Sequence, residues 1–580
     1  MVRAWVDGVL LCLFAGTAFA QQVPSTAQPG TIEREQRQRP PQARSTSPLP
    51  GVTVKEEAQQ APPGADTTTF TLQSLAVDGN SVLSDDDLLA AYRSEIGRTV
   101  SVQRVYDIAA GMTAKYRDAG YVLSSVVVPA QSITDGRVTL SAVEGYLSDV
   151  KVEGDTGRRS GMLEEMRQQL TSERPLRLAT LERNLLLLND LPGTTAQGVL
   201  KRSATAAGGS DLTIRLAKQV VGFDAGVNNR GSEVQGPTRY EAGLALNSIF
   251  GLFSETQIRF LAADPTSELK YGFISHTERL SADGLDLRLY GSKSRSDPQL
   301  GVDYQDYNLE TNTDEFGGEL RFPIIRSRAQ NLYVRTALTY HDGKTDAAPG
   351  FESEQTRDTI SAARIGLTYD RVDGWNGVNI ADFEFSQGLA LFGASRANDP
   401  QLSRDGGRPD FTKTTLYLAR LQSLGRGWSL LLAASGQYAF NNLLAPEEFA
   451  FGGEIFGRAY DSSEIVGDSG VAGKLELRYT FDALGRGGLT AYGFYDAGKV
   501  WRRLSAGDRE AGCAPEDQTG CTEDDATSWG GGLRYTISSW LTGYVEAAVP
   551  IDHIVAAEGN DDTRVFAGLR VQFGSAQTVN

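Results

Sequence analysis

The sequence predicts an all-β transmembrane barrel of about sixteen antiparallel strands, preceded by two small α+β modules. Three features indicate this fold class. The first twenty residues form a secretory signal, residues 68–218 repeat a β-α-α-β-β pattern, and residues 219–573 alternate apolar and polar residues in segments of about ten. No run of about eighteen apolar residues follows the signal, so no transmembrane helix is expected.

The signal, residues 1–20, has the usual three parts. Arg3 provides the basic start, an apolar run follows from Val9, and the ending Ala-Phe-Ala fits cleavage before Gln21. A buried N-terminal helix is the alternative, but the cleavage pattern favours export. The mature protein is therefore expected outside the cytoplasm.

Export determines what the cysteines are expected to do. Cys12 leaves with the signal, and in an oxidising compartment Cys513 and Cys521 are expected to form a small disulfide-closed loop. The three histidines are isolated along the chain, so we expect neither a metal site nor another cofactor. The net charge of -17 argues against nucleic acid as a partner, because phosphate binding requires concentrated Lys and Arg.

Residues 21–67 are expected to form a linker. They are rich in Pro, Gln, Ser and Thr and lack apolar periodicity, so they cannot bury enough surface to fold alone. Within them only the stretch from Thr31 to Arg39 fits a short helix, which Pro40 ends.

The first module is expected over residues 68–146. A strand in FTLQSLAVDGN precedes a helix that starts at a capping box of Ser84 and Asp87, and a second helix ends before Gly120. Two strands, in YVLSSVVV and RVTLSAVE, complete the module. The apolar positions of the second helix recur at helical spacing: Val105, Ile108, Ala109, Met112 and Tyr116.

The second module, residues 147–218, repeats this order. VKVEGD at 150–155 matches LAVDGN at 75–80 with an offset of 75 residues, and two helices and two strands follow. Chance similarity between short apolar runs is the alternative, but the shared order of elements favours duplication.

The segment from Trp428 to Phe440 shows why residues 219–573 are assigned to a membrane barrel. Its even positions are mostly large and apolar and would face lipid, while its odd positions are mostly small or polar and would face a wet lumen, as would Arg335 and Glu546 in other segments. Ten residues at about 3.3 Å each, tilted by about 40°, span roughly 25 Å, the height of such a barrel's apolar band. A soluble β-sandwich or propeller is the alternative, which the export signal and the aromatic residues at the segment ends disfavour.

Residues 453–470, GEIFGRAYDSSEIVGDSG, are too irregular for a strand or a helix, yet they carry a single arginine, Arg458. A guanidinium in a narrow pore must be hydrated or paired, and a planar carboxylate is its best partner. Asp496 lies on the face of a predicted strand that cannot contact lipid. We therefore expect Arg458 to pair with Asp496 and hold a long loop against the inner wall. An exposed, unpaired Arg458 is the alternative.

Tandem modules of this order, followed by a sixteen-strand barrel, resemble the two-partner secretion transporters of the outer membrane. These are also called haemolysin secretion/activation proteins (ShlB/FhaC/HecB-like), and their modules are polypeptide-transport-associated (POTRA) domains. The likeness covers nearly all of the mature chain. In the first module it is carried by GNSVLSDDDL, YRDAGYVLSSVVVPAQ and DGRVTLSAVEG.

The resemblance implies that residues 441–470 fold back into the pore. The family has a Val-Arg-Gly-Tyr motif at the tip of this loop and a Phe/Gly-x-Asp-x-Gly motif on a nearby strand. The loop glycines Gly452, Gly453 and Gly457 are expected to let the backbone pass in tight quarters. The first motif corresponds to Gly457, Arg458, Ala459 and Tyr460, with departures at Gly457 and Ala459. The second matches fully at Phe494, Asp496 and Gly498.

The resemblance further implies transport of one large, unfolded exoprotein from the periplasm to the cell surface, without enzymatic activity. The POTRA domains in the periplasm would receive the cargo, and the barrel would form the pore in outer-membrane lipid after insertion by the barrel-assembly machinery. In related transporters a longer N-terminal helix plugs the barrel, and the short helix from Thr31 argues against that role here. The last strand ends at Phe573, so residues 574–580 form a C-terminal tail.

Other functions are weighed against secretion. A barrel-assembly insertase of the same superfamily usually carries more modules, and a passive porin would not need them. The string GDSG at residues 467–470 also surrounds the nucleophile of chymotrypsin-like proteases. However, Ser469 has no histidine in the matching sequence context, so a protease is disfavoured.

Overall fold

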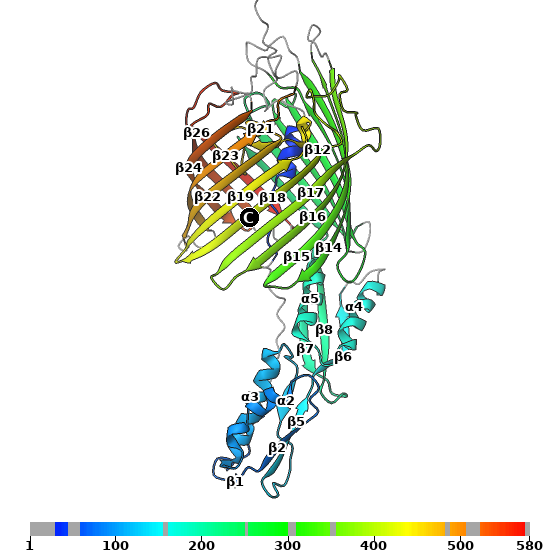
Figure 1. The fold of residues 1–580 in the computed structure, drawn as a ribbon, viewed down its shortest axis with the longest axis vertical. Helices are drawn as coiled ribbons and strands as arrows, with labels where there is room; N and C mark the ends of the chain where they lie inside the picture. The colour runs from blue at the N-terminus through cyan, green and yellow to red at the C-terminus, as the bar shows by residue number, and fades with distance from the viewer. Residues whose placement is uncertain are drawn as a thin grey trace, which may run out of the picture.

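The computed structural model of the chain describes residues 30–44, 59–154, 160–249, 253–299, 309–347, 355–481, 488–505 and 522–574. The predicted signal and the predicted Cys513–Cys521 disulfide lie outside these residues. Figure 1 shows two small domains, one after the other, leading to a barrel. Among the helices in the described ranges, none is long and apolar enough to cross a membrane.

The first domain is built on a three-stranded sheet of order β2-β5-β4, in which β2 and β5 run parallel and β4 and β5 antiparallel. Helix α3 packs on this sheet through the five apolar residues that the pattern singled out. The Ser84 hydroxyl accepts a hydrogen bond from the Asp87 N–H at 3.2 Å, which confirms the predicted helix start. The elements are β1 (Thr69–Thr71), β2 (Ser74–Asp78), α2 (Asp85–Ala90), η2 (Arg93–Glu95), β3 (Thr99–Ser101), α3 (Val102–Asp118), β4 (Ser125–Val127) and β5 (Arg137–Val143).

The second domain has the same topology. Its sheet order is β6-β8-β7, with β6 and β8 parallel and β7 and β8 antiparallel. The elements are β6 (Tyr146–Glu153), α4 (Ser160–Ser172), α5 (Leu178–Asn189), β7 (Thr194–Arg202) and β8 (Gly209–Lys218).

The repeated glycine has the same structural cause in both domains. Gly79 has a φ of 84° and Gly154 a φ of 116°, a conformation that L side chains rarely adopt. A Cβ atom at Gly79 would lie 2.6 Å from the Ala142 carbonyl oxygen, and one at Gly154 would lie 2.5 Å from that of Leu216. The sequence repeat therefore corresponds to a repeated turn against the neighbouring strand, as duplication requires.

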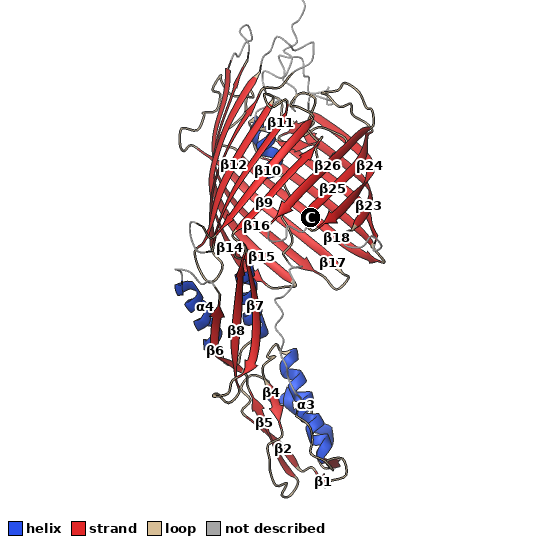
Figure 2. Ribbon diagram, turned by 180° about the vertical axis from the view of Figure 1, so that it is seen from behind, coloured by secondary structure: helices blue, strands red, loops and turns tan. Residues whose placement is uncertain are grey.

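Within the described residues, sixteen antiparallel strands close into a barrel, as predicted. The first and last barrel strands, β9 and β26, pair over a register that runs from Gly568 opposite Asn228 to Phe573 opposite Phe223, and Figure 2 shows them side by side. The barrel strands are β9 (Val221–Asn228), β10 (Thr238–Asn247), β11 (Ser254–Asp264), β12 (Leu269–Arg279), β13 (Asp286–Ser296), β14 (Glu310–Arg326), β15 (Gln330–Asp346), β16 (Gln355–Val372), β17 (Gly377–Leu389), β18 (Thr412–Gly425), β19 (Trp428–Ala439), β22 (Ser469–Phe481), β23 (Leu489–Trp501), β24 (Glu523–Ser538), β25 (Leu541–Pro550) and β26 (Arg564–Phe573).

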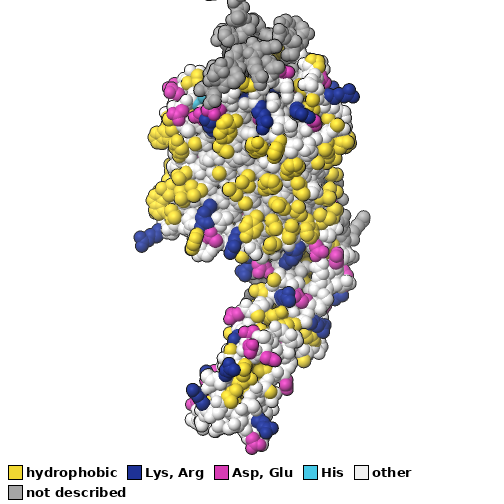
Figure 3. Space-filling view, in the orientation of Figure 1, with side chains coloured by type: hydrophobic (Ala, Val, Ile, Leu, Met, Phe, Trp, Pro, Cys, Tyr) yellow, Lys and Arg dark blue, Asp and Glu magenta, His cyan; other side chains and the backbone are white. Residues whose placement is uncertain are grey.

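The two faces of the barrel wall differ as the alternation predicts. On β19, Trp428 and Tyr438 point outward and are 44% and 55% exposed, whereas Ala433 and Gln437 are buried on the inner side. Figure 3 shows hydrophobic side chains over the barrel wall, with most charged side chains near its two ends and on the small domains. This distribution fits a wall that faces lipid outside and a polar lumen inside.

The second domain is joined to the barrel through buried charges. Asp190, just after α5, accepts two hydrogen bonds of 2.8 Å from the Arg326 guanidinium at the end of β14. Burial raises the pKa of Asp190, but Arg326 and Arg44 outweigh it and hold the pKa below its ordinary value. In addition, Arg183 of α5 donates to the Pro323 carbonyl at 3.0 Å. The domain is thus held on the barrel turns that it faces.

Candidate functional site: the segments inside the barrel

The long segment between β19 and β22, residues 440–468, lies inside the barrel, and we call it the pore loop. It contains η4 (Ala445–Glu447) and a short hairpin of β20 (Phe449–Phe451) and β21 (Ile465–Gly467). In Figure 1 this segment lies within the upper part of the barrel. Its apolar side chains, including Phe451 and Tyr460, pack against inward residues of the wall such as Ala472 and Val500.

Arg458 lies near the tip of the pore loop and contacts the inner wall. It is 2% exposed, and its guanidinium makes two parallel hydrogen bonds to Asp496 of β23, from Nε to Oδ2 at 2.9 Å and from Nη2 to Oδ1 at 3.0 Å. The Arg458 guanidinium also lies over the Phe494 ring, 3.5 Å from the ring centroid. The structure thus brings together the residues that the sequence analysis grouped.

The Asp496 carboxylate accepts four hydrogen bonds from the loop. Besides the two from the Arg458 side chain, its carboxylate accepts the backbone N–H groups of Gly457 and Arg458, at 3.2 and 3.1 Å. Within the described residues no barrel side chain donates to it. The buried carboxylate is therefore satisfied only while the loop tip is in place.

Two further carboxylates surround Arg458, and sequence reasoning did not assign them to this site. Glu476 of β22 accepts a hydrogen bond from Arg458 Nη1 and is also paired with Arg478 and Arg534. Glu546 of β25, which the alternation did place on the inner face, lies 3.8 Å from Arg458 Nη1. The signal for Glu476 was present, because a charge at an inward position of a barrel strand needs a partner in the lumen.

The glycines of the site make room for the loop. A Cβ atom at Gly498 would overlap the ring of Phe451, and one at Gly457 would lie 2.6 Å from the same ring. Gly452, Gly453 and Gly457 have φ values of 122°, 95° and 79°, which side-chain-bearing residues rarely adopt. Phe451 is therefore the side chain that Gly457 and Gly498 accommodate, whereas Gly452 makes room for the Asp461 carbonyl, which would lie 2.1 Å from its Cβ atom.

Tyr460 fixes the side of the tip that faces β24. Its hydroxyl donates to the Thr527 carbonyl oxygen at 2.7 Å. Next to it, the Ala459 carbonyl accepts from Arg564 Nη1 at 3.0 Å, and Asp461 accepts from Arg564 Nη2 at 2.7 Å. The tip is thus bound by strands on several sides of the lumen.

The N-terminal segment corrects one expectation. Helix α1 (Thr31–Arg37) lies inside the barrel, not in a free linker, and Figure 1 shows it beside the pore loop. Its length argued against a plug, but tertiary contacts hold it. Arg34 donates to the Ala445 carbonyl at 2.6 Å, Arg37 pairs with Glu447 at 3.1 Å, and Glu35 pairs with Arg239 of β10 at 3.0 Å.

The chain after α1 leads from the lumen toward the POTRA-like domains. Gln38 donates to the Ala450 carbonyl of the pore loop at 3.4 Å. Arg44 lies 3.4 Å from Asp190 at the domain joint, and its guanidinium is 5.4 Å from the centroid of the Tyr333 ring. The segment therefore enters the barrel at the end where the domains are attached.

The protease alternative has no geometric support. Ser469 begins β22, and its hydroxyl oxygen accepts the N–H of Ala439 at 3.1 Å. Asp468 accepts from the Leu443 N–H and from Arg404, at 2.6 Å each. The residues thus anchor the end of the pore loop. In the part of the chain that the structure describes, no group of three or more His, Cys, Asp or Glu residues is arranged to hold a metal ion.

Two α+β domains, a sixteen-strand barrel and an occluded lumen define a class of outer-membrane transporter. The model of the family described as haemolysin secretion/activation protein ShlB/FhaC/HecB matches residues 208–516, more than half of the chain, and the ShlB-type POTRA domain matches residues 70–145. The chain belongs to this haemolysin secretion/activation protein family. It acts in the secretion of a partner protein through the outer membrane.

Individual transporters are similar to this chain over most of their length. The heme/hemopexin transporter protein HuxB of Haemophilus influenzae strain 86-028NP is 23% identical over 72% of this chain and 74% of its own. The outer membrane transporter CdiB of Dickeya dadantii is 21% identical over 85% of this chain and 86% of its own. The solved structure of CdiB from Escherichia coli aligns with a TM-score of 0.68 at 18% identity, covering 93% of this chain and 96% of that one.

Proposed function

We propose that this transporter moves one large, unfolded exoprotein from the periplasm to the cell surface, through the lumen that α1 and the pore loop now fill. The observation that carries this proposal is the occupied lumen: a pore closed by two separate segments suits a cargo that must displace at least one of them. No enzymatic step is part of the proposal. We also infer that the barrel-assembly machinery inserts the barrel into outer-membrane lipid.

The two α+β domains would lie in the periplasm and receive the cargo. Among the described residues, no further strand pairs with the outer edge of β2 in the first domain or of β6 in the second. The opposite edge strands, β4 and β7, are partly covered, because the Val126 N–H donates to Thr113 and the Ala196 N–H donates to Asn189. Open edges such as those of β2 and β6 can add an extended segment by main-chain hydrogen bonds with little sequence demand, which suits a passing unfolded chain.

Opening would begin with α1. Once α1 leaves, Glu447 would keep Arg364 at 2.6 Å and Lys413 at 2.7 Å, so the wall and the loop stem remain paired. The segment after α1 already runs to the domain joint, which gives the helix an exit on the periplasmic side.

A barrel-assembly insertase is the second candidate. The structure of BamA from Haemophilus ducreyi lacking POTRA domains 1–3 aligns with a TM-score of 0.52 at 15% identity, covering 87% of this chain and all of that one. This likeness supports a shared fold only, and the family match favours secretion.

A reversible cross-link tests whether α1 must move. A Cβ atom at Gly30 would lie 3.2 Å from the Pro446 Cβ, close to the spacing of about 3.5–4.5 Å in disulfides. In a Cys513→Ala, Cys521→Ala background, the pair Gly30→Cys and Pro446→Cys would tie the helix to the pore loop. The measurement is surface arrival of a co-expressed candidate exoprotein from the neighbouring reading frame. We expect secretion to stop and to return on reduction, with each single cysteine as control. Undiminished secretion by the cross-linked protein would contradict the proposal.

Removing the first POTRA domain tests the receiving step. Deletion of residues 70–145 should abolish secretion while the barrel stays folded and heat-modifiable. A deletion variant that secretes normally would leave the domain without the proposed role.

A further inference from the structure

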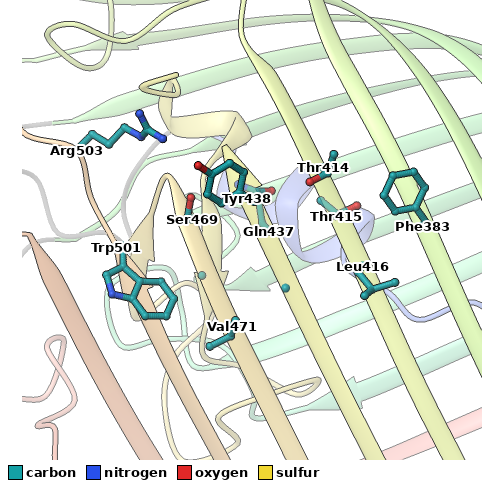
Figure 4. A pocket seen from close by; sticks show the side chains of 12 residues that line it. Phe383, Thr414, Thr415, Leu416, Gln437, Tyr438, Ser469, Val471, Trp501 and Arg503 are labelled. Atoms are coloured by element: carbon teal, nitrogen blue, oxygen red, sulfur yellow. The ribbon is translucent and has the colours of Figure 1, made fainter. Parts of the chain in front are cut away.

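We propose that the outer wall of the barrel carries a binding groove for an anionic lipid, with an acyl chain in the groove and a headgroup phosphate at Arg503. The groove has a volume of about 610 Å³, within the usual range of about 300–1,000 Å³ for ligand sites. Figure 4 shows Trp501 and Val471 on one side and Leu416 and Phe383 on the other. The inference rests on the proposed orientation of the domains, but not on cargo transport.

The floor of the groove is formed where a side chain is missing. Gly436 of β19 lies in register between Leu416 of β18 and Val471 of β22. Those two neighbours are 43% and 50% exposed and point outward, and so do Tyr438 and Trp501. A Cβ atom at Gly436 would meet nothing closer than 3.6 Å, so the space in front of it is open. Apolar side chains on both sides of a glycine, which has no side chain itself, form a groove that can hold a hydrocarbon chain.

The groove lies at the end of the wall away from the POTRA domains. Trp501 is the last residue of β23, and Tyr438 lies ten positions along β19 from Trp428 at the opposite end. Aromatic side chains of such barrels mark the two membrane interfaces. With the domains in the periplasm, Tyr438 and Trp501 mark the outer interface, so the groove lies in the outer leaflet.

Arg503 lies two residues after Trp501, and hydrogen bonds hold it near the outer interface, where lipid headgroups would lie. Its N–H donates to Asp468 at 2.7 Å, its carbonyl accepts from Arg404 at 2.8 Å, and its Nη2 donates to the Ala439 carbonyl at 2.8 Å. The side chain is exposed, and no carboxylate of the described residues lies within salt-bridge distance of it. A fixed guanidinium with donors left over is a good partner for phosphate.

Together these features indicate which kind of lipid the groove would bind. The outward face of a barrel meets lipid, so whatever fills the groove must be apolar along most of its length. Arg503 at the rim, which has no carboxylate partner among the described residues, adds a preference for negative charge over a zwitterionic headgroup. A phosphorylated glycolipid of the outer leaflet combines both properties.

Two variants and two matched controls test the groove. Arg503→Gln removes the charge, and Gly436→Leu fills the floor. Arg426→Gln removes an exposed arginine from the turn at the opposite rim, and Gly473→Leu adds the same leucine to β22 outside the groove. All four changes lie on the surface, and heat-modifiability on gels shows whether each barrel is folded.

The measurement is native mass spectrometry of the full chain, released from a neutral detergent with bis-phosphorylated, hexa-acylated lipid A or with phosphatidylcholine as probe. We expect one retained lipid A and no comparable retention of phosphatidylcholine. Arg503→Gln and Gly436→Leu should each lower the retained fraction at least fivefold, with both controls unchanged. Equal retention by all variants, equal loss in the controls, or a dimer that the groove variants dissociate would overturn the proposal. The last result would assign the groove to a second copy of the chain.

Discussion

The tip of the pore loop and helix α1 both fill the lumen, but they are held in different ways. Arg458 is surrounded by carboxylates from three strands, and the Asp496 carboxylate accepts four hydrogen bonds from the loop. Helix α1 has seven residues and no side-chain cap. A helix of this length is marginal by itself and stays in the lumen only through its contacts with the pore loop and the wall, so the helix is the segment more easily removed. The comparison indicates a fixed loop tip and a displaceable helix.

The largest expected effect on the stability of the pore loop comes from removing the guanidinium of Arg458. Arg458→Ala would leave Asp496 buried with only backbone donors, and breaking such a pair costs about 3–5 kcal/mol. We expect a markedly lower temperature of barrel unfolding on unheated gels, protease cleavage within residues 440–468, and loss of secretion.

Arg478→Ala is the matched control. Arg478 contacts Glu476 from the same strand, and Glu476 keeps Arg458 and Arg534 without it. If the control and Arg458→Ala behave alike, the tip is not specially fixed. A reciprocal charge swap between positions 458 and 496 is a poorer test, because a carboxylate at 458 would face Glu476.

A smaller effect is expected from crowding the loop. Gly498→Ala would push the new methyl group into the Phe451 ring, and overpacking of this kind costs about 1–3 kcal/mol. Phe451→Ala in the same chain should restore part of the loss, because it removes the clashing ring. Protease sensitivity of the loop in the four members of this double-mutant cycle measures the coupling. Simple additivity of the two changes would show that the contact is not made.

Deleting residues 30–37 should leave the barrel intact. The wall keeps its strand pairing and Glu447 keeps two cations, so the gel-shift temperature should stay near that of the parent chain. The conductance in planar bilayers should rise, because α1 is gone from the lumen. Unchanged conductance would mean that the pore loop alone closes the lumen.

The smallest effects are expected from substituting two acidic residues of α1, Glu33 and Glu35. The two substitutions should change the frequency of channel opening in opposite directions. Glu33→Gln replaces a buried carboxylate whose Oε2 has no hydrogen-bond partner among the described residues, so docking should strengthen and open events should become rarer. Glu35→Gln breaks the pair with Arg239, so open events should become more frequent. Single-channel recordings of the two variants provide the comparison. If both variants changed the frequency of open events in the same direction, the contacts assigned to the helix would be contradicted.

Local patterns were sufficient to predict the architecture. Alternation along each barrel strand, the capping box at Ser84 and the repeated Val-x-Gly turn all depend on residues close together in sequence, and the structure has these features as expected. The first domain differs in detail, because the strand predicted in YVLSSVVV is only Ser125–Val127 and a small sheet of β1 and β3 was not predicted. The strands β14 to β16 are longer than the segments of about ten residues that the pattern suggested, since they extend past the apolar band.

The plug was missed because its stability is not local. Seven residues next to prolines make a poor helix alone. The contacts that hold it join Glu33 to Ser294 and Glu35 to Arg239, pairs 261 and 204 residues apart, and no pattern in a single sequence links them. Glu476 was missed for a related reason: alternation tells that a side chain faces the lumen, but not which loop residue it meets there.

The most direct test of a fixed tip and a displaceable helix is a pair of distance measurements by double electron-electron resonance in outer-membrane vesicles. One spin label at Gln38 reports on the helix segment and one at Ser462 on the pore loop, each measured to the same label on a barrel turn. We predict a second distance population for the helix label only, with the loop label giving one narrow distance. A single narrow distance for the helix together with two populations for the loop would contradict the account.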